Sequence, residues 1–524
     1  MNAFSRVGII RAENVTTAVV HLNVVSGDTP TFSPFAPTPP DDLDKQHELG
    51  QFLTPSPVAE FMASLFETPR SEVHLLDAGA GAGALSAALV RRLCHEPPKP
   101  KRISITAYEI DTAQIAPLQA KLDDCRHKCE LAGISFSAKV LNEDFIAAAV
   151  PLVRRDLFTS QPPHFNAAII NPPYRKIRSD SSTRLLLRSA GIETSNLYAG
   201  FVSLAMRLLA KGGELVAITP RSFCNGPYFK PFRSDLLETM SLRRLHVFES
   251  RCAAFSGDDV LQENIIFHAV KEGPKPTRII ISTSSGESNG AVLERAVDFR
   301  EIVSPDDSEQ FIHLPTDDQH VLARRVMEQF STSLSALGVS VSTGRVVDFR
   351  AREFLRKEPR HGTAPLIYPC HFNRGFVHWP KEKARKPNAI VSNERTRELL
   401  VPAGVFVLVK RFTAKEERRR VVACIYDSHQ IKAPLVGFEN HLNYFHSAGH
   451  GLPMRLARGL AAFLNSTVLD FYFRQFNGHT QVNATDLRNL NYPSRAELEQ
   501  LGEKIPDPGI SQEELDGIVK EELF

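Results

Sequence analysis

The sequence predicts an α/β protein with a mainly parallel sheet covered by helices. From residue 46 to about 270, short β-branched runs alternate with helical patterns, and such alternation indicates βαβ units. The strand candidates are VHLLDA, SITAYE, FSAKVLN, NAAII, ELVAIT and NIIFHAV. The chain has 524 residues, which suggests two or three domains of ordinary size. Its 42% hydrophobic and 23% charged content is typical of globular proteins and excludes a disordered or fibrous one.

Proline content and pattern divide the chain into three predicted parts. Residues 29–40 hold five prolines in twelve positions, so residues 1–45 are predicted to form a peripheral arm. Residues 46–325 are predicted to form the α/β domain. Residues 326–524, where the patterns are irregular, are predicted to form a second domain of mixed helices and strands.

The second predicted domain has a marked charge asymmetry. Residues 341–493 hold 24 Lys and Arg against 12 Asp and Glu, a net charge of +12, although the whole chain carries only +2. Residues 494–524 hold nine acidic and three basic residues and are predicted to form an acidic tail. A basic segment in an acidic frame is typical of a polyanion-binding module. A solvated, salt-bridged face explains the charge alone equally well.

Hydropathy and cysteine usage predict a cytoplasmic protein. Every long apolar run is broken by a charge well before 18 residues, and the N-terminus has no signal pattern, so we expect no membrane segment. Seven cysteines without regular spacing fit a reducing compartment. Cys125 and Cys129 flank His127, but no further ligands follow at zinc-finger spacing. We interpret all three as ordinary helix residues and expect no metal.

A glycine-rich turn follows the first strand candidate. Val73–Leu76 lead into Asp77, Gly79 and Gly81, and a helical pattern then resumes. A strand, a glycine turn and a helix allow the backbone to approach a ligand closely at the helix N-terminus. The turn alone is compatible with NAD, FAD or S-adenosylmethionine, and also with a purely structural role.

Acidic residues follow the next two strand candidates. Glu109 ends the second one and is placed to accept both ribose hydroxyls of an adenosine, a feature that NAD and S-adenosylmethionine share. Asp144 and Phe145 follow the third. Asp144 is placed to accept from an adenine amino group while Phe145 packs against the ring, although an Asp after a strand is often only a helix N-cap.

The fourth strand candidate runs directly into Asn171, Pro172, Pro173 and Tyr174. Two successive prolines fix the backbone and remove two N–H donors, so the Pro172 carbonyl and the Asn171 side-chain oxygen are both predicted to point outward as acceptors. Such a pair suits an amino group on a planar ring, which can stack on Tyr174. Two acceptors would localise the lone pair of that amine and aim it at an electrophile without a strong base. The alternative is a strand-ending turn with a buried aromatic residue.

These motifs resemble those of the gamma-class N6-adenine DNA methyltransferases of type II restriction–modification systems, the group that includes the TaqI methylase. The family's T-P-x-x-V-A segment matches LGQFLTPSPVAEFMASL, with Thr54 in the corresponding place. The resemblance implies a Rossmann-like class I S-adenosylmethionine-dependent methyltransferase domain followed by an α+β target-recognition domain. Two departures are Ala78, where the family often has Pro, and Asn166, where it often has Asp.

The resemblance also implies roles for single residues. Catalysis falls on Asn171, Pro172, Pro173 and Tyr174, and stacking on an extruded target base falls on Tyr174 and Phe255. S-adenosylmethionine is expected at Thr54, Asp77, Gly79, Gly81, Glu109, Ile110, Asp144, Phe145 and Asn171. Phosphate contacts to double-stranded DNA are expected from Arg374, Lys410, Arg411, Arg418, Arg419 and Arg420.

The expected protein is therefore a prokaryotic, cytoplasmic, monomeric adenine-specific DNA methyltransferase, with any cognate restriction endonuclease on a separate chain. One alternative is methylation of an RNA base or a protein glutamine, because N-P-P-Y serves those amines as well. The T-P-x-x-V-A segment and the basic second domain argue against it. A non-catalytic DNA-binding specificity subunit is a second alternative, which the intact motifs disfavour. A fused nuclease is a third, but the N-terminal arm is too short to hold one.

Overall fold

The structure is a computed structural model that forms two compact units, which divide between Thr316 and Asp317. It describes residues 17–20, 54–67, 70–154, 164–248, 263–284, 291–383, 385–413, 417–477, 481–506 and 510–524. The boundary predicted after residue 325 falls inside α10 (Asp318–Met327). This helix belongs to the second unit because it packs on α13 (Thr467–Phe476), where Gln475 Nε2 donates to the backbone oxygen of His320 at 2.7 Å.

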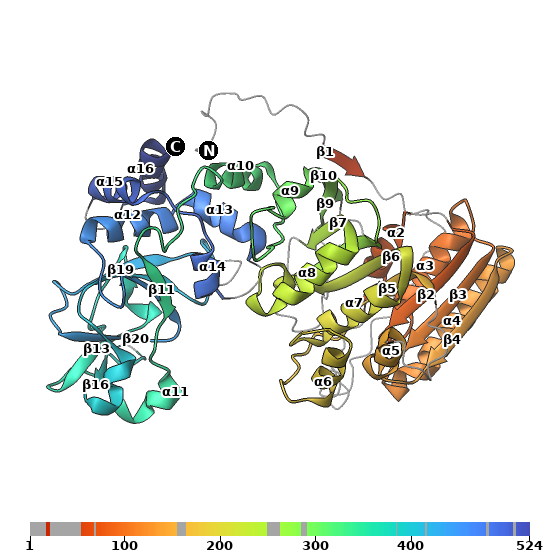
Figure 1. The fold of residues 1–524 in the computed structure, drawn as a ribbon, viewed down its shortest axis with the longest axis horizontal. Helices are drawn as coiled ribbons and strands as arrows, with labels where there is room; N and C mark the ends of the chain where they lie inside the picture. The colour runs from red at the N-terminus through yellow and green to blue at the C-terminus, as the bar shows by residue number, and fades with distance from the viewer. Residues whose placement is uncertain are drawn as a thin grey trace. The chain divides into compact units, whose positions relative to one another are not determined.

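The first unit is built on a ten-stranded sheet (Figure 1). Neighbouring strands from β4 through β6 are parallel, β8 is antiparallel to both β6 and β7, and β9 is parallel to β7. The predicted parallel α/β class is thus confirmed. In spatial order the strands are β1 (Thr17–Val20), β10 (Val292–Asp298), β9 (Arg278–Ser284), β7 (Met240–Phe248), β8 (Asn264–Lys271), β6 (Leu209–Pro220), β5 (Phe165–Ile170), β2 (Glu72–Ala78), β3 (Arg102–Tyr108) and β4 (Ser135–Leu141).

Helices cover both faces of this sheet, because its central strands are apolar on both sides. In β5, Ala168 and Ile170 face one core and Ala167 and Ile169 face the other. The first core receives α5 (Phe145–Arg154), α6 (Ser182–Ser189), α7 (Leu197–Leu208) and α8 (Lys230–Thr239). The second core receives α2 (Ser56–Ser64), α3 (Ala84–His95) and α4 (Thr112–Leu131).

The order of the parallel strands reverses between β2 and β5. The chain runs outward from β2 to β3 and β4, then returns to place β5 on the other side of β2. Loops on either side of such a switch point diverge and leave a crevice at the carboxyl ends of the strands. The glycine-rich turn follows β2 and the N-P-P-Y motif follows β5, so both motifs lie at this crevice.

The second unit combines two smaller sheets with helices, as the predicted mixed class requires. One sheet has the order β11 (Ser340–Thr343), β21 (Leu442–His446), β18 (Val405–Lys410), β19 (Ala423–Asp427), β15 (Phe376–Val377) and β14 (Phe372–Asn373). The other has the order β12 (Leu355–Arg356), β16 (Ala389–Val391), β13 (Thr363–Ile367), β20 (Leu435–Phe438) and β17 (Leu400–Pro402). The later helices are α12 (Met454–Leu464), α13, α14 (Ala484–Arg488), α15 (Arg495–Lys504) and α16 (Gln512–Leu523).

Two segments predicted to be peripheral contain regular structure. Within residues 1–45, the described strand β1 pairs antiparallel with β10. Residues 494–524, predicted to be an acidic tail, hold α15 and α16, whose apolar side chains at helical spacing are buried: Leu498, Leu501, Leu515 and Val519. The acidic residues occupy the outer faces of these helices, which composition alone does not reveal.

The three residues of the cysteine cluster all lie on α4 and diverge in exposure. Cys125 and Cys129 are buried, with Cys129 Sγ 3.7 Å from Cys94 Sγ, whereas His127 is exposed. No group of three potential metal ligands occurs among the described residues. Likewise, no helix in the described ranges is both long and apolar enough to cross a membrane.

Helices α12 and α15 are in direct backbone contact. A Cβ atom on Gly459 would lie 1.7 Å from the backbone oxygen of Leu498, and one on Gly502 would lie 1.9 Å from that of Arg455. Neither neighbour is a side chain that can move aside, so any larger residue must push the two helices apart. These two glycines therefore attach α15 to the rest of the second unit.

We expect Gly459→Ala to destabilise the second unit by about 1 to 3 kcal/mol, the usual cost of overpacking a core. Gly517→Ala on α16 is the matched control, because a Cβ there has no described atom within 4 Å. The control should gain about 0.5 to 1 kcal/mol, since alanine is the better helix former. Urea unfolding followed by circular dichroism measures both, and equal midpoints for the two variants would contradict the backbone contact.

Candidate active site

A cavity lies at the carboxyl ends of the strands around the switch point. It gathers residues from the ends of β2, β3, β4 and β5 and from the segment that follows β5. The predicted site residues that line it are Gly79, Gly81, Glu109, Ile110, Asp144, Phe145, Asn171 and Pro173. Side chains that the sequence analysis did not single out also line it, among them Gln114, Arg175, Thr183 and Phe201. Gln114, Thr183 and Phe201 enter the cavity from α4, α6 and α7, whereas Arg175 directly follows the N-P-P-Y motif.

The glycine-rich turn forms the floor of the cavity. Gly79 has φ +78°, a conformation that other residues adopt at a cost, and a Cβ there would sit 3.7 Å from the Phe201 ring and 4.0 Å from the backbone oxygen of Asn171. The N–H groups of Gly79 and Ala80 both donate to the backbone oxygen of Tyr108 at 2.9 Å. The turn is thereby attached to the end of β3, and glycine leaves room for a ligand between β2 and β5.

Asp77 lies beneath this turn, fully buried, and does not line the cavity. Its Oδ2 accepts from Ser86 Oγ at 2.6 Å, which joins the end of β2 to α3. Burial raises the pKa of Asp77 to about 7 against that hydrogen bond, which lowers it. Its Oδ1 is also buried and has no hydrogen-bond partner among the described residues. Inside a protein such an oxygen is costly, so the position favours a donor supplied from outside the chain.

Glu109 is held between the glycine-rich turn and the end of β3. Its carboxylate is buried and accepts from the N–H of Gly81 and from the N–H of Asp111, both at 2.7 Å. Asn142 Nδ2 donates to the backbone oxygen of Glu109 at 2.8 Å. Ile110 follows with 52% of its surface exposed, an unusual exposure for isoleucine that is explained by its place on the cavity wall. The arrangement offers a fixed carboxylate beside an apolar surface.

Asp144 caps α5 and also lines the cavity, so its capping role does not exclude the predicted adenine contact. Its Oδ1 accepts from the N–H of Ile146 at 2.8 Å, and its other oxygen is not engaged by that bond. Phe145 is almost fully buried, with its ring 5.2 Å from that of Tyr108 and 5.1 Å from that of Phe201. It therefore presents one side of a packed aromatic cluster to the cavity.

The Asn171 amide is oriented from both ends. Its Nδ2 donates to Thr54 Oγ1 at 3.0 Å, and its Oδ1 accepts from the Tyr174 hydroxyl at 3.0 Å. Burial raises the pKa of Tyr174 well above its usual value, so this hydroxyl remains a donor. Thr54 precedes α2 and is 117 residues away from Asn171 in sequence. The sequence analysis assigned Thr54 to the cofactor and missed its contact with the N-P-P-Y motif.

Tyr174 lies between the two hydrophobic cores and is partly buried against both. Its ring meets that of Tyr198 edge to face, with the centroids 6.3 Å apart. Its hydroxyl also lies 3.4 Å from the backbone oxygen of Ile218 at the end of β6. Phe255, the second predicted stacking residue, lies outside the described residues.

The second unit has a cavity that gathers four of the six predicted DNA-contacting cations, namely Arg374, Lys410, Arg418 and Arg419. Arg458 joins them, and no described residue that lines this cavity is acidic. Arg374 and Arg418 are exposed, whereas Arg419 donates to the backbone oxygen of Asn465 at 2.8 Å.

The other two predicted cations lie elsewhere. Arg411 does not line this cavity, and its guanidinium bonds Gln481 and Asn440. Arg420 is only 2% exposed and donates to the backbone of Thr413 and to the side chain of Asn477. A guanidinium that is buried and bonded in this way cannot reach a DNA phosphate. The prediction that Arg420 contacts DNA is therefore corrected to a structural role.

The fold and the cavity define the class of the protein. The parallel sheet reverses its order between β2 and β5, and the antiparallel strand β8 is inserted between β6 and β7. A glycine-rich turn and an acidic residue at the end of β3 line the cavity. Together these features form the Rossmann-like domain of a class I S-adenosylmethionine-dependent methyltransferase. This confirms the predicted fold class and cofactor.

Comparison with known proteins places the chain more narrowly. Residues 106–255 match the Eco57I restriction-modification methylase family. The chain is 46% identical over 484 residues to the type II methyltransferase M.PstI of Providencia stuartii, covering 92% of this chain and 94% of the relative. It is 43% identical over 487 residues to M.BsuBI of Bacillus subtilis, covering 92% and 95%.

Among solved structures, the type IIG restriction endonuclease BpuSI is similar, with 14% identity and a TM-score of 0.41 over 90% of this chain and 62% of that one. The two curated relatives match nearly the whole of both chains. The chain belongs to the type II methyltransferases of restriction–modification systems, which confirms the resemblance found in its motifs.

We expect Thr54→Val to lower kcat for methyl transfer about fivefold, because a typical hydrogen bond contributes about 1 kcal/mol and this one orients the Asn171 amide. Thr54→Ser keeps the hydroxyl and should retain the wild-type rate. Steady-state kinetics with varied S-adenosylmethionine separates the two roles of Thr54. A raised KM for the cofactor with an unchanged kcat would make Thr54 a cofactor contact only, and the orienting role would be wrong.

Proposed function

We propose that the protein transfers a methyl group from S-adenosylmethionine to N6 of an adenine within a specific double-stranded DNA sequence. The observation that carries this proposal is the Asn171 amide, which lines the cavity and is oriented by Thr54 at Nδ2 and by Tyr174 at Oδ1. An oxygen acceptor at that place, beside the Pro172 carbonyl, suits an exocyclic amine and does not suit a ring carbon. In this proposal the protein is the modification enzyme of a restriction–modification system.

The cavity fits S-adenosylmethionine in its polar and apolar parts. Glu109 would accept the two ribose hydroxyls and Asp144 the adenine amino group, with Ile110 against the adenine ring. Asp77 lies beneath the turn and does not line the cavity, so it would act on the ammonium group of the methionine moiety through the turn and not by direct contact. When bound, S-adenosylmethionine supplies an electrophilic methyl group.

The protein's own contribution is to orient the amine. Asn171 Oδ1 and the Pro172 carbonyl would accept the two hydrogens of the adenine amino group and keep its lone pair directed toward the cofactor cavity. Tyr174 would stack on the base, and Phe255 is proposed as a second aromatic contact. An adenine can reach this position only when it is flipped out of the duplex. Such catalysis consists of positioning and needs no strong base.

The second unit supports a nucleic acid as the substrate over a protein glutamine, and the restriction–modification family of the relatives supports DNA over RNA. A cavity whose described lining holds five cations and no acid suits a polyanion, which a glutamine side chain is not. We assign residues 326–524 to target recognition, with phosphate contacts from Arg374, Lys410, Arg418 and Arg419. In this proposal the protein is a monomer in the prokaryotic cytoplasm, and a separate restriction endonuclease acts on the same site.

Incubation of unmethylated plasmid with the protein and S-adenosylmethionine, followed by single-molecule sequencing, tests the proposal. N6-methyladenine confined to one short motif is the expected result, and it would give the recognition sequence as well. Binding of the cofactor without any modified adenine would contradict it and would favour an RNA or protein amine.

We expect Asn171→Ala to lower methyl transfer by at least about a hundredfold, the usual loss when one electrostatic contact to the reacting group is removed. Affinity for S-adenosylmethionine should change little, because the proposed ribose and adenine contacts lie on Glu109 and Asp144. The rate is measured by methyl incorporation into plasmid, and the affinity by calorimetric titration. A variant with wild-type turnover would exclude the proposed role of Asn171.

Charge reversal at Arg374 and Arg418 tests the cation-lined cavity of the second unit. The double variant Arg374→Glu and Arg418→Glu should bind DNA more weakly and reduce the slope of log affinity against log salt by about 2, since each phosphate contact contributes about 0.9. The matched control reverses Lys357 and Arg360, which are exposed but do not line the cavity. If both variants show the same slope, the cavity is not part of the DNA interface.

A further inference from the structure

We propose that Lys176 and Arg178, on the segment directly after the N-P-P-Y motif, bind the DNA phosphates that flank the target adenine. This inference rests on the proposed function and adds a DNA contact on the first unit itself. The observations that carry it are the rigid support of this segment, the direction of the two side chains, and the absence of an acidic partner for either of them in the described chain.

The segment forms a short antiparallel stem with the chain that enters α7. Lys176 and Asn196 form an isolated antiparallel β-bridge through their backbones. The N–H of Ile177 donates to the backbone oxygen of Ser195 at 2.7 Å, and the N–H of Leu197 donates to the backbone oxygen of Arg175 at 2.8 Å. Ile177 is buried in the core of the first unit, with 8% exposure. Because side chains alternate along an extended segment, Lys176 and Arg178 both point away from that core. Both are exposed.

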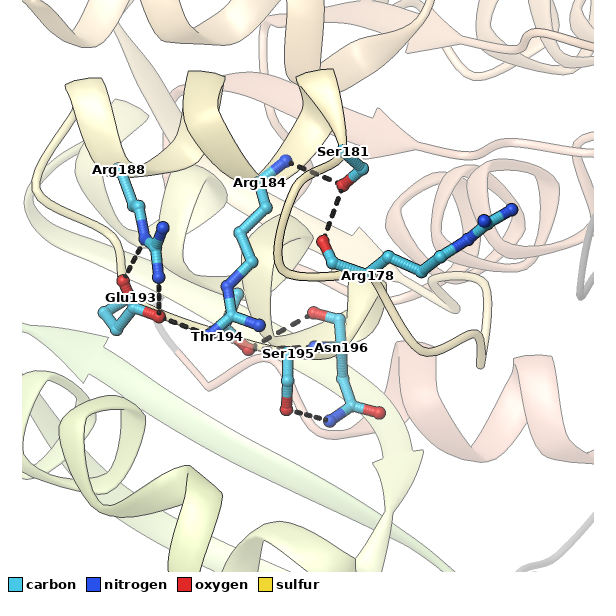
Figure 2. A network of polar contacts seen from close by, with 8 residues as sticks. All are labelled: Arg178, Ser181, Arg184, Arg188, Glu193, Thr194, Ser195 and Asn196. Carbon is cyan, nitrogen blue, oxygen red and sulfur yellow. Dashed lines mark hydrogen bonds and ion pairs between the residues drawn. The ribbon is translucent and has the colours of Figure 1, made fainter.

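A polar network fixes the position of the segment (Figure 2). Ser181 Oγ donates to the backbone oxygen of Arg178 at 2.9 Å and accepts from the N–H of Arg184 at the start of α6. Leu187 of α6 is fully buried against α7, where a Cβ on Gly200 would meet it at 2.8 Å. The two cations are therefore attached to a packed element and not to a loop that must first be ordered.

Two other arginines of this region are paired with one carboxylate. Glu193 accepts from Arg188 Nε at 2.6 Å and from Arg184 Nη2 at 2.5 Å. These hydrogen bonds, first from Arg188 and then from Arg184, lower the pKa of Glu193 to about 2, so it stays ionised at any ordinary pH. Arg184 and Arg188 thus serve the fold of the segment and are not available to a ligand.

Lys176 and Arg178 differ from that pair in having no such partner. Among the described residues, neither side chain forms an ion pair or a hydrogen bond, and in Figure 2 the Arg178 side chain extends away from the network. Asp180 is the nearest acidic residue in sequence and is also exposed, so the segment keeps a positive excess. Unpaired cations on a rigid support form a favourable site for anions, because the backbone that carries them needs little further ordering when an anion binds.

The short distance of Lys176 and Arg178 from Tyr174 indicates which anion they bind. Arg178 follows Tyr174 by four residues, so their backbones are at most about 14 Å apart even if fully extended. A flipped nucleotide remains joined to the phosphates on either side of it, and those phosphates must stay at the mouth of the pocket that holds the base. The cations beside the pocket therefore meet the backbone at the target nucleotide, whatever the surrounding sequence.

The double variant Lys176→Glu and Arg178→Glu tests this contact through direct DNA binding. Affinity for a duplex that contains the motif the enzyme methylates should fall. The slope of log affinity against log salt should decrease by about 2, because two phosphate contacts are lost. Affinity for S-adenosylmethionine should remain that of the wild type, which also shows that the first unit is folded. The matched control reverses Lys99 and Lys101, two exposed cations that precede β3 and so lie at the amino ends of the parallel strands, away from the N-P-P-Y motif at their carboxyl ends.

The outcomes separate this inference from the proposed function. If the wild type modifies adenine and the two double variants have equal salt slopes, the segment does not bind phosphates and the inference is wrong. If the wild type binds DNA but modifies another base, the proposed adenine specificity fails, while the slopes still decide the phosphate contact. If the wild type binds only RNA with the same salt response, both proposals are wrong.

Discussion

The orientation of one amide determines whether the cavity can act on an amine. Asn171 presents its oxygen or its NH2 group depending on a half-turn about the last side-chain bond, and only the oxygen accepts from an amine. Thr54 fixes the choice by accepting from Nδ2, and Tyr174 supports it by donating to Oδ1. The segment before α2, the end of β5 and the turn after it must therefore come together before the Asn171 amide is oriented to accept from an amine.

The sheet makes this assembly possible. β5 is a central strand with cores on both faces, and its partners β2 and β6 fix it laterally. The position of Asn171, which directly follows β5, is therefore fixed as well. The strand β2 on one side carries the glycine-rich turn, and Gly79 keeps the gap to the backbone of Asn171 open. The residues proposed to bind the cofactor and Asn171 thus line one cavity because the strand order reverses between β2 and β5.

The motifs could be predicted from the sequence because each lies within a few consecutive residues. Gly79, Glu109, Asp144 and Asn171 end strands of one parallel sheet, so their local positions already imply that they meet. The contact between Thr54 and Asn171 could not be predicted from spacing, since it depends on where α2 packs. Burial was equally out of reach: Arg420 and Arg418 are near neighbours in a run of three arginines, yet one is enclosed by Thr413 and Asn477 and the other is exposed.

Net charge was accordingly a poor guide to where a polyanion binds, because much of the positive charge is used within the fold. Glu193 pairs with both Arg184 and Arg188, and polar groups of the second unit enclose Arg420. Among the other cations, one group lies beside the N-P-P-Y motif and another lines the cavity of the second unit. Under the proposed function the first group holds the backbone of any nucleotide that enters the pocket. Contacts of that kind carry no sequence information. Discrimination among DNA sequences must then come from base contacts made elsewhere, which the separate second unit is free to vary without disturbing the Asn171 amide.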